Sequence, residues 1–350
     1  MLLYVFYFNL FIFIFLIISV SFLLTSGLTN KTTRNDTIIF TNKSDIQMFH
    51  NYHTDLRNFN YSGKCGEVFQ YPKNSKRDLW LTAYSFNDNK SFLRLNRSID
   101  FVLGLANSSI SHATKKILLM SPPPFKNFEH MYDKYGISIE LFDAKISNST
   151  KQGNSATRRM FAWKEWLYPR RHLYDRVFIS DLRDIYIFGD IFATFSENDL
   201  LLQMQCLNNN TNCFTFNFKV DYNWMKKTIG VDVANAYRKN NTIASNVGTI
   251  LGGTNKVLGY LQTFIEYTNF DKWDIWGYDQ SLHNWLIYSR KLDFLKPVLE
   301  SCSQRMCYEE RYAFIYDKTR KMIYTNNTKC SPVMRHKIFY ANEYFKLSGN

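Results

Sequence analysis

Two acids and an arginine follow a hydrophobic run near the middle of the chain. Residues 174–192 have the sequence YDRVFISDLRDIYIFGDIF, so a β-rich run ends at Asp181, Arg183 and Asp184. Carboxylates at a strand end supply the hard oxygen atoms that Mg²⁺ and Mn²⁺ prefer, and such an ion can bridge a diphosphate. Arg183 can add paired hydrogen bonds to a phosphate. The alternative is that these charges cap the strand and pair only with one another.

Strands and helices that alternate along the chain are expected to bring these residues to one edge of a sheet. Apolar and β-branched runs predict strands at 79–86, 116–120, 137–142 and 176–180. Apolar stripes at helical spacing predict helices at 91–106, 125–135 and 158–167. The alternation implies an open α/β sheet, mixed but mostly parallel, with helices on both faces. Ligands bind beyond the carboxyl ends of such strands, here after Tyr84, Met120, Phe142 and Ser180.

The segment around the acids resembles the metal-binding strand end of GT-A glycosyltransferases, where a hydrophobic strand leads into a D-x-D motif. It looks closer to a branch of that superfamily whose motif is Asp-Val-Arg-Asp, then a Phe and an Asp-Pro-Phe. The corresponding residues here are Asp181, Leu182, Arg183, Asp184, Phe188, Asp190, Ile191 and Phe192, with Ile191 in place of the proline. The resemblance implies a GT-A-like fold in which Asp181 and Asp184 hold Mn²⁺ or Mg²⁺ and Arg183 assists catalysis.

The spacing of the two acids departs from the family's pattern. In Asp-x-x-Asp the carboxylates would point to opposite faces of a regular strand, because side chains alternate with period two. A turn that begins at Leu182 would bring both acids round to one site. Alternatively, one acid holds the metal while Arg183 takes over the neutralisation of phosphate.

Three further stretches fit the same resemblance in order, which spans about residues 79–340. Residues 245–253, SNVGTILGG, are similar to a strand of small residues that lets a donor sugar approach the backbone. Residues 277–280, GYDQ, resemble an Asp-Gln motif that contacts donor or acceptor, and residues 332–336, PVMRH, resemble a late segment whose histidine completes the metal site. The residues implied for donor or acceptor binding are Ser245, Asn246, Gly248, Gly252, Gln280 and Asn284, with Asp279 catalytic and His336 a metal ligand.

Aromatic residues beside Asp279 predict where an acceptor would lie. Most tryptophans belong to a protein's core, but Trp273, Trp276 and Tyr278 are bunched next to Asp279. Aromatic faces stack well on sugars and bases. We therefore expect the acceptor pocket at this bunch, with Trp276 as a binding residue.

The later motifs also have purely structural interpretations. Residues 245–253 can form a tight bend beside a helix. Asp279 can be the N-cap of a helix at 280–288, because aspartate is a favoured cap and an apolar run follows. His336 can be a surface or core histidine, as most isolated histidines are.

Composition indicates a globular protein and argues against a nucleic-acid-binding arm. The 350 residues are 45% hydrophobic and 17% aromatic, enough for one large domain or two small ones. The net charge of +13 is spread in twos and threes, which favours anionic small ligands or a membrane face. No Walker-type loop and no GxGxxG follows the first strand, which argues against P-loop and dinucleotide-dehydrogenase functions.

The N-terminus predicts a membrane anchor. Residues 4–24 carry no charge, and about 20 apolar residues span a bilayer. We expect a cytoplasmic tail at 1–3, a signal anchor at 4–24, a stem at 25–75 and a lumenal catalytic domain at 76–345, in a single-pass type II protein of the Golgi or endoplasmic reticulum. Lys31 and Arg34 favour the opposite orientation. Cleavage of the segment as a signal peptide, followed by secretion, is the alternative.

Sequons and cysteines favour the secretory lumen. Sequons for N-glycosylation occur at Asn30, Asn35, Asn42, Asn60, Asn89, Asn96, Asn107, Asn148, Asn209, Asn240 and Asn326. Six cysteines suit an oxidising compartment, although they allow 15 pairings. Short separations favour Cys206 with Cys213 and Cys302 with Cys307, which leaves Cys65 with Cys330. Free buried thiols are the alternative.

These features together predict a glycosyltransferase that moves a hexose from a nucleotide-diphosphate sugar to a glycan, glycolipid or glycoprotein. Two rivals remain open. One is a non-catalytic lumenal sugar-binding protein with a GT-A-like fold, favoured by the shifted acid spacing and by Ile191. The other is a metal-dependent hydrolase, which would typically need more acids and histidines than these scattered 7 histidines provide.

Overall fold

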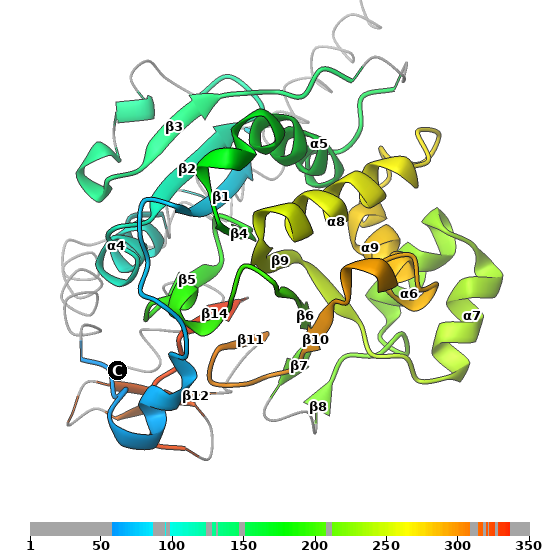
Figure 1. Cartoon of the computed structure of the whole chain (residues 1–350). Coiled ribbons are helices and arrows are strands. Elements are labelled where there is room, and N and C mark those ends of the chain that lie inside the picture. Colours follow the sequence, from blue (N-terminus) through cyan, green and yellow to red (C-terminus); the bar gives the residue numbers. More distant parts are fainter. Residues whose placement is uncertain are drawn as a thin grey trace, which may run out of the picture. The chain divides into compact units, whose positions relative to one another are not determined.

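A seven-stranded sheet lies at the centre of the computed structural model (Figure 1). The structure describes residues 58–86, 95, 99–123, 128–130, 132–146, 151–207, 212–308, 314–317, 320, 322–325 and 328–336. The predicted anchor at 4–24 and the end of the predicted catalytic domain at 337–345 lie outside them. Among the described helices, none is both long and apolar enough to cross a bilayer.

The central sheet is mixed and mostly parallel, as the sequence predicts. Its strand order is β3-β2-β1-β4-β9-β6-β10. The strands are β1 Asp78–Tyr84, β2 Thr114–Leu119, β3 Ser138–Leu141, β4 Arg176–Ser180, β6 Leu200–Met204, β9 Ser245–Gly253 and β10 Val298–Glu300. β9 runs antiparallel to both of its neighbours, and the other neighbouring pairs are parallel. The carboxyl ends of β1 and β4 therefore meet at one edge of the sheet.

Helices cover both faces of this sheet. They are α4 Ile99–Ser109, α5 Ser155–Leu167, α6 Lys219–Thr228, α7 Val231–Lys239, α8 Thr254–Glu266 and α9 Tyr278–Tyr288. Figure 1 shows α5 and α8 on one side of the sheet and α4 on the other. Because strand side chains alternate, Leu79 and Leu81 of β1 join the core with Trp163 of α5, whereas Trp80 between them stacks on Phe178 at 6.5 Å. Each face thus buries its own apolar layer.

Smaller sheets and short helices complete the domain. A three-stranded sheet has the order β11-β14-β5, with β5 Ile185–Ile187, β11 Met306–Tyr308 and β14 Met334–His336. Two hairpins pair β7 Cys206–Leu207 with β8 Asn212–Cys213 and β12 Phe314–Asp317 with β13 Met322–Thr325. The 3₁₀ helices are η1 Gly63–Val68, η2 Phe128–His130, η3 Asp133–Tyr135, η4 Tyr168–Leu173, η5 Ile191–Thr194 and η6 Asp293–Leu295.

The prediction of one helix at 125–135 is wrong for the described residues of this range. Phe128 and Tyr132 are both buried. Phe128 belongs to the short 3₁₀ turn η2, and Tyr132 directly precedes the second turn, η3. The second turn ends at Gly136, whose φ of 61° is left-handed. The other expected elements are found, with α4 described continuously only from Ile99. Two short turns satisfy the same apolar spacing that predicted one helix.

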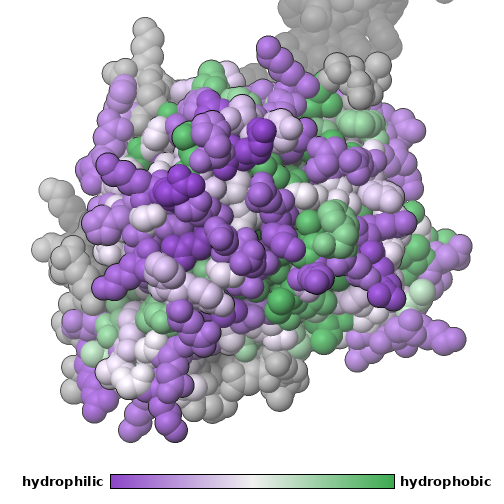
Figure 2. Space-filling view, in the orientation of Figure 1, coloured by the Kyte–Doolittle hydropathy of each residue, from purple (hydrophilic) through white to green (hydrophobic). Residues whose placement is uncertain are grey.

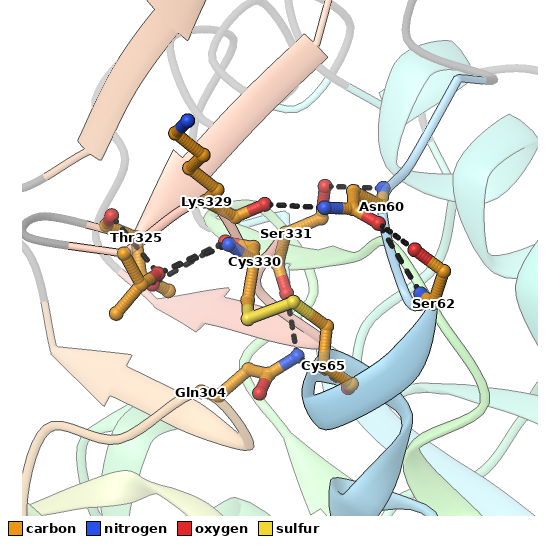
Figure 3. The surroundings of a disulfide bond; sticks show 9 residues. Asn60, Ser62, Cys65, Gln304, Thr325, Lys329, Cys330 and Ser331 are labelled. Carbon is orange, nitrogen blue, oxygen red and sulfur yellow. Dashed lines mark hydrogen bonds between the residues drawn. A yellow bond between two sulfur atoms is a disulfide. The ribbon is translucent and has the colours of Figure 1, made fainter.

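All three favoured disulfides are confirmed: Cys65–Cys330, Cys206–Cys213 and Cys302–Cys307. The first joins two ends of the described chain (Figure 3). Beside it the amide of Asn60 donates to the carbonyl of Lys329 at 2.6 Å, and the Tyr61 hydroxyl donates to Pro332 at 2.7 Å. Residues 58–75, which the sequence assigned to the stem, are therefore held to the domain that contains the central sheet. Their polar composition suggested a linker, because contacts to residues near 330 leave no pattern in the local sequence.

The surface seen in the orientation of Figure 1 is largely hydrophilic (Figure 2). Hydrophobic residues gather near the centre and right of this face. Exposed apolar side chains on η6 and the edge strand β10 are Phe294, Val298 and Leu299.

Candidate functional site

Asp181, Asp184 and His336 converge on one point. Each offers an atom to a group in which all ligand atoms lie within 4.8 Å of one another. The Nε2 atom of His336 lies 3.3 Å from Oδ2 of Asp181 and 3.8 Å from Oδ1 of Asp184. His336 and Asp184 are buried, and Asp181 keeps 17% of its side chain exposed. The three side chains predicted to hold metal thus form one half-open donor set.

A bend explains how both acids reach the same site. β4 ends at Ser180, residues 182–184 bend, and β5 begins directly after Asp184. Leu182 is buried and anchors the bend. In the small sheet, β14 pairs with β5 so that His336 lies opposite Ile185, the residue after Asp184. The turn expected at Leu182 is therefore present.

Buried partners fix the orientation of the His336 ring. Its Nδ1 atom lies 2.8 Å from the side-chain oxygen of Gln203 on β6 and 3.0 Å from the hydroxyl oxygen of Thr249 on β9. With the Gln203 oxygen accepting from Nδ1, the Nε2 atom of His336 is the one that can bind a metal ion between the two acids. A histidine ligand held from behind in this way is a common feature of metal sites.

Gly248 leaves the space that the donor set needs. A Cβ atom at this position would lie 2.5 Å from Oδ2 of Asp181 and 2.8 Å from Cε1 of His336. The backbone also helps, because the N–H of Asp181 donates to the Gly248 carbonyl at 2.9 Å. Two carboxylates and one imidazole in such a cradle fit Mn²⁺ well and Mg²⁺ less well, since imidazole nitrogen is the softer donor.

Arg159 bridges two of the predicted acids, a role the sequence did not reveal. Lying on α5, it forms an ion pair with Asp181 through Nη1 and another with Asp279 through Nη2, the latter at 3.2 Å. Burial opposes its charged form, but the charges of Asp181 and Asp279 outweigh this, and the pKa of the guanidinium is raised. Asn154 caps α5 by accepting from the N–H of Thr157 at 2.9 Å, which fixes the start of the helix.

Asp279 is buried in the first turn of α9. The N-cap of that helix is Gly277, so the alternative interpretation of Asp279 as its N-cap is wrong. Burial raises the pKa of the Asp279 carboxyl, while Arg159 and the N–H of Gln280 lower it in part. A carboxylate near a helix N-terminus is further stabilised by the helix dipole. The net effect is a raised pKa, because the cost of burying the charge outweighs these stabilising contacts.

Arg159 and the three aspartates, Asp181, Asp184 and Asp279, line a pocket of about 310 Å³ beyond the ends of β1 and β4. Of the residues predicted to bind donor or acceptor, Asn246, Gly248, Gln280 and Trp276 also line it, and so does Arg183. Trp224, from α6, also lines it and was not predicted. Trp273 and Tyr278 do not, because both are buried in the core. Of the three aromatic residues expected near the acceptor, only Trp276 therefore lines the pocket.

Three other predicted binding residues have structural roles. The amide of Asn284 accepts from the N–H of Ser245 and donates to its carbonyl, both at 2.8 Å. Gln280 adds bonds to Val247 at 3.0 Å and to Ser245 at 2.7 Å, so its amide docks β9 on α9 although its side chain borders the pocket. Gly252 lies toward the far end of β9, where a Cβ would meet the carbonyl of Asp199 at 2.5 Å. Ser245, Asn284 and Gly252 thus position the strand that carries Gly248.

Comparisons with family models and with curated proteins identify no relative. A scan against models of protein families finds no match, and a search of curated proteins finds no significant match either. The chemistry open to this protein therefore follows from its donor set and pocket. Two acids and a histidine that could hold a divalent cation, together with two guanidinium groups, suit a phosphorylated ligand, and the exposed Trp276 suits a sugar ring.

Proposed function

We propose that this protein is a metal-dependent, GT-A-like glycosyltransferase that moves a hexose from a nucleotide-diphosphate sugar to an acceptor in the secretory pathway. The observation that supports this best is the convergence of Asp181, Asp184 and His336, of which the two acids line a pocket beyond the carboxyl ends of parallel strands. Ligands bind at that edge of open α/β sheets. A mixed, mostly parallel sheet with helices on both faces also agrees with the proposed fold.

The net charge of the pocket lining favours the binding of a divalent cation. The charged residues that line the pocket are three carboxylates and two guanidinium groups, which leaves one net negative charge when all are ionised. Such a pocket repels a diphosphate. Mn²⁺ or Mg²⁺ held by the two acids and the histidine would reverse the sign of that charge and supply Lewis-acid stabilisation of the leaving diphosphate. Donor binding should therefore depend on the cation.

Two residues of the pocket have distinct proposed roles. Arg183 keeps 27% of its side chain exposed and lies 3.9 Å from Asp184, so it can contact a phosphate above the metal ligands. Asp279 would orient the sugar or accept the proton of the incoming hydroxyl, which requires a hydrogen bond of about 3 Å to that oxygen. Burial raises the pKa of its carboxyl, which makes it a stronger proton acceptor than an exposed aspartate.

The compartment is proposed on similar grounds. Three disulfides suit the oxidising lumen of the secretory pathway. One exposed sequon, Asn240, lies at the C-terminal end of α7, where an oligosaccharide can be attached without disturbing the core. We propose a membrane-anchored protein that faces the lumen, with secretion after cleavage as the alternative.

A binding experiment tests the proposal directly. The full chain, purified in detergent micelles, is titrated by calorimetry with a panel of UDP- and GDP-sugars in Mn²⁺ and in EDTA. We expect binding that requires Mn²⁺ and that Asp181→Ala abolishes, followed by release of the sugar when an acceptor is added. Metal-dependent binding without any turnover would favour the non-catalytic sugar-binding protein. If the folded protein binds no nucleotide sugar, both the transferase and the non-catalytic sugar-binding protein are rejected.

A further inference from the structure

One tryptophan at the mouth of the pocket is unusually exposed. Trp276 has 63% of its surface accessible, whereas Trp273, three residues earlier, has 2%. Large aromatic side chains are normally buried, so an exposed one beside a polar pocket suggests a ligand that covers it. Trp276 lines the pocket that holds the metal-binding acids.

A second tryptophan is held beside it by Gly277. This glycine has a left-handed φ of 83°, and a Cβ here would lie 2.3 Å from Cγ of Trp224. The indole of Trp224 therefore packs directly on the Gly277 backbone, next in the chain to Trp276. α6 packs against α9, which keeps the Trp224 ring in place. Trp224 and Trp276 form what we call the tryptophan platform.

Sheet order separates this platform from the other end of the pocket. Tyr84 and Met120 line the pocket at the ends of β1 and β2. β4, which delivers the acids, lies between β1 and β9, and α9 packs on β9. The metal-binding acids therefore lie between an end built by β1 and β2 and an end built by the platform. Two ligand parts can lie on opposite sides of one reacting centre.

We propose that the tryptophan platform binds the acceptor and that the acceptor group bound there is a neutral saccharide. This deepens the proposed function and rests on it. The C–H face of a sugar ring stacks on an aromatic ring, while its hydroxyl groups need polar partners. Asp279 and Asn246 supply such partners in the same pocket. A lipid chain would instead need a groove lined by apolar side chains along its length, and five of the lining residues are charged.

Steady-state kinetics with separate donor and acceptor readouts test the platform. The full chain is assayed with its nucleotide-sugar donor for slow hydrolysis in water and for transfer to methyl glycosides and short oligosaccharides. Long-chain alcohols and unglycosylated peptides serve as alternative acceptors. We expect Trp276→Ala and Trp224→Ala each to raise the saccharide KM about tenfold while donor KM and hydrolysis stay unchanged. Trp276→Phe should restore most of the affinity.

A matched control and the contrary outcomes complete the test. Phe294→Ala removes another exposed aromatic side chain, 66% accessible, that does not line the pocket, and it should change neither KM. If donor hydrolysis persists but saccharide KM is the same in wild type and both tryptophan variants, the platform is overturned and the transferase stands. Faster transfer to alcohols or peptides than to saccharides would also overturn it. If folded protein turns over no donor, the proposed function fails and the platform falls with it.

Discussion

The side-chain oxygen of Gln203 lies 2.8 Å from Nδ1 of His336, although 133 residues separate them in the chain. Gln203 belongs to the central sheet and His336 to the small sheet, so one hydrogen bond joins the two at the candidate metal site. Both residues are fully buried. The bond fixes which nitrogen of the imidazole faces Asp181 and Asp184.

Gln203→Leu should weaken Mn²⁺ binding about 10–100-fold, the usual cost of losing an outer partner of a histidine ligand. Without the acceptor, the His336 ring can rotate or place its proton on Nε2. Calorimetric titration with Mn²⁺ measures the effect. Gln203→Glu keeps an oxygen at this position and should retain most of the affinity. Equal affinities for wild type and Gln203→Leu would mean that His336 does not bind the metal through Nε2.

Gly248→Ala should abolish Mn²⁺ binding with little loss of stability. The added methyl would lie 2.5 Å from Asp181 and 2.8 Å from His336, so one of the two side chains must move away from the site. Ile250→Val on the same strand is the matched control, because it should cost about 0.5–1.5 kcal/mol of unfolding free energy without affecting metal binding. Urea unfolding and Mn²⁺ titration of both variants separate the two effects. Undiminished Mn²⁺ binding by Gly248→Ala would contradict the site.

The strands of the fold could be predicted because their apolar runs are continuous. β4 is buried along its whole length and β2 is buried from Ile117 to Leu119, and the apolar runs predicted both strands. The turns η2 and η3 could not, because buried residues four apart fit a helix as well as two turns. The packing of residues 58–75 was also missed, since it depends on a disulfide and hydrogen bonds to residues near 330.

Only some residues of the candidate site could be predicted from the sequence. Asp181, Asp184 and His336 lie in motifs, whereas Arg159 stands beside Arg158 with no local difference between them. Successive residues on a helix point about 100° apart, so Arg158 reaches Asp143 and Arg159 reaches Asp181. Only the packing of α5 on the sheet decides which arginine faces the pocket.

Gln203 carried a weak signal of its own. It is a polar residue inside the run LLLQMQ of a buried strand. A buried amide needs a hydrogen-bond partner, so its presence there could have indicated a special role. The sequence gives no hint that the partner is His336.

Arg159→Met should lower turnover and shift the acidic limb of the pH–rate profile to higher pH. Arg159 lowers the pKa of Asp279, which burial raises, so its removal leaves burial unopposed and Asp279 takes up a proton at higher pH. Arg159→Lys keeps a charge and should shift the limb less. The rate of transfer measured from pH 5 to pH 8 checks this. An unshifted acidic limb would mean that protonation of Asp279 does not cause the loss of rate at low pH.

Loss of Cys65–Cys330 should destabilise the protein more than loss of Cys206–Cys213. The first closes a separation of 265 residues and the second one of 7. Loop-closure entropy makes the expected difference in unfolding free energy about 3 kcal/mol. Serine variants of each pair, compared by urea unfolding under non-reducing conditions, give the two values. Equal losses would show that the entropy of the long loop does not control stability here.

His283 should make the protein less stable as the pH falls below 6.5. Its ring lies between the Tyr260 hydroxyl, which donates to Nδ1 at 2.7 Å, and Oγ of Ser245, which accepts from Nε2 at 2.9 Å because its own proton is donated to Gln203. Burial lowers the pKa of His283 from 6.5 to about 3, so the folded state keeps the ring neutral while the unfolded chain takes up a proton.

The stability due to neutral His283 is therefore complete above pH 6.5 and is lost as the pH falls toward 3. One proton gives a slope of up to about 1.4 kcal/mol per pH unit. Urea unfolding between pH 5 and pH 6.5, where most carboxylates remain ionised, measures it. His283→Gln should flatten the slope, whereas His130→Gln, at a surface histidine with 69% of its side chain exposed, should not. If His283→Gln leaves the slope unchanged, another group takes up the proton on unfolding.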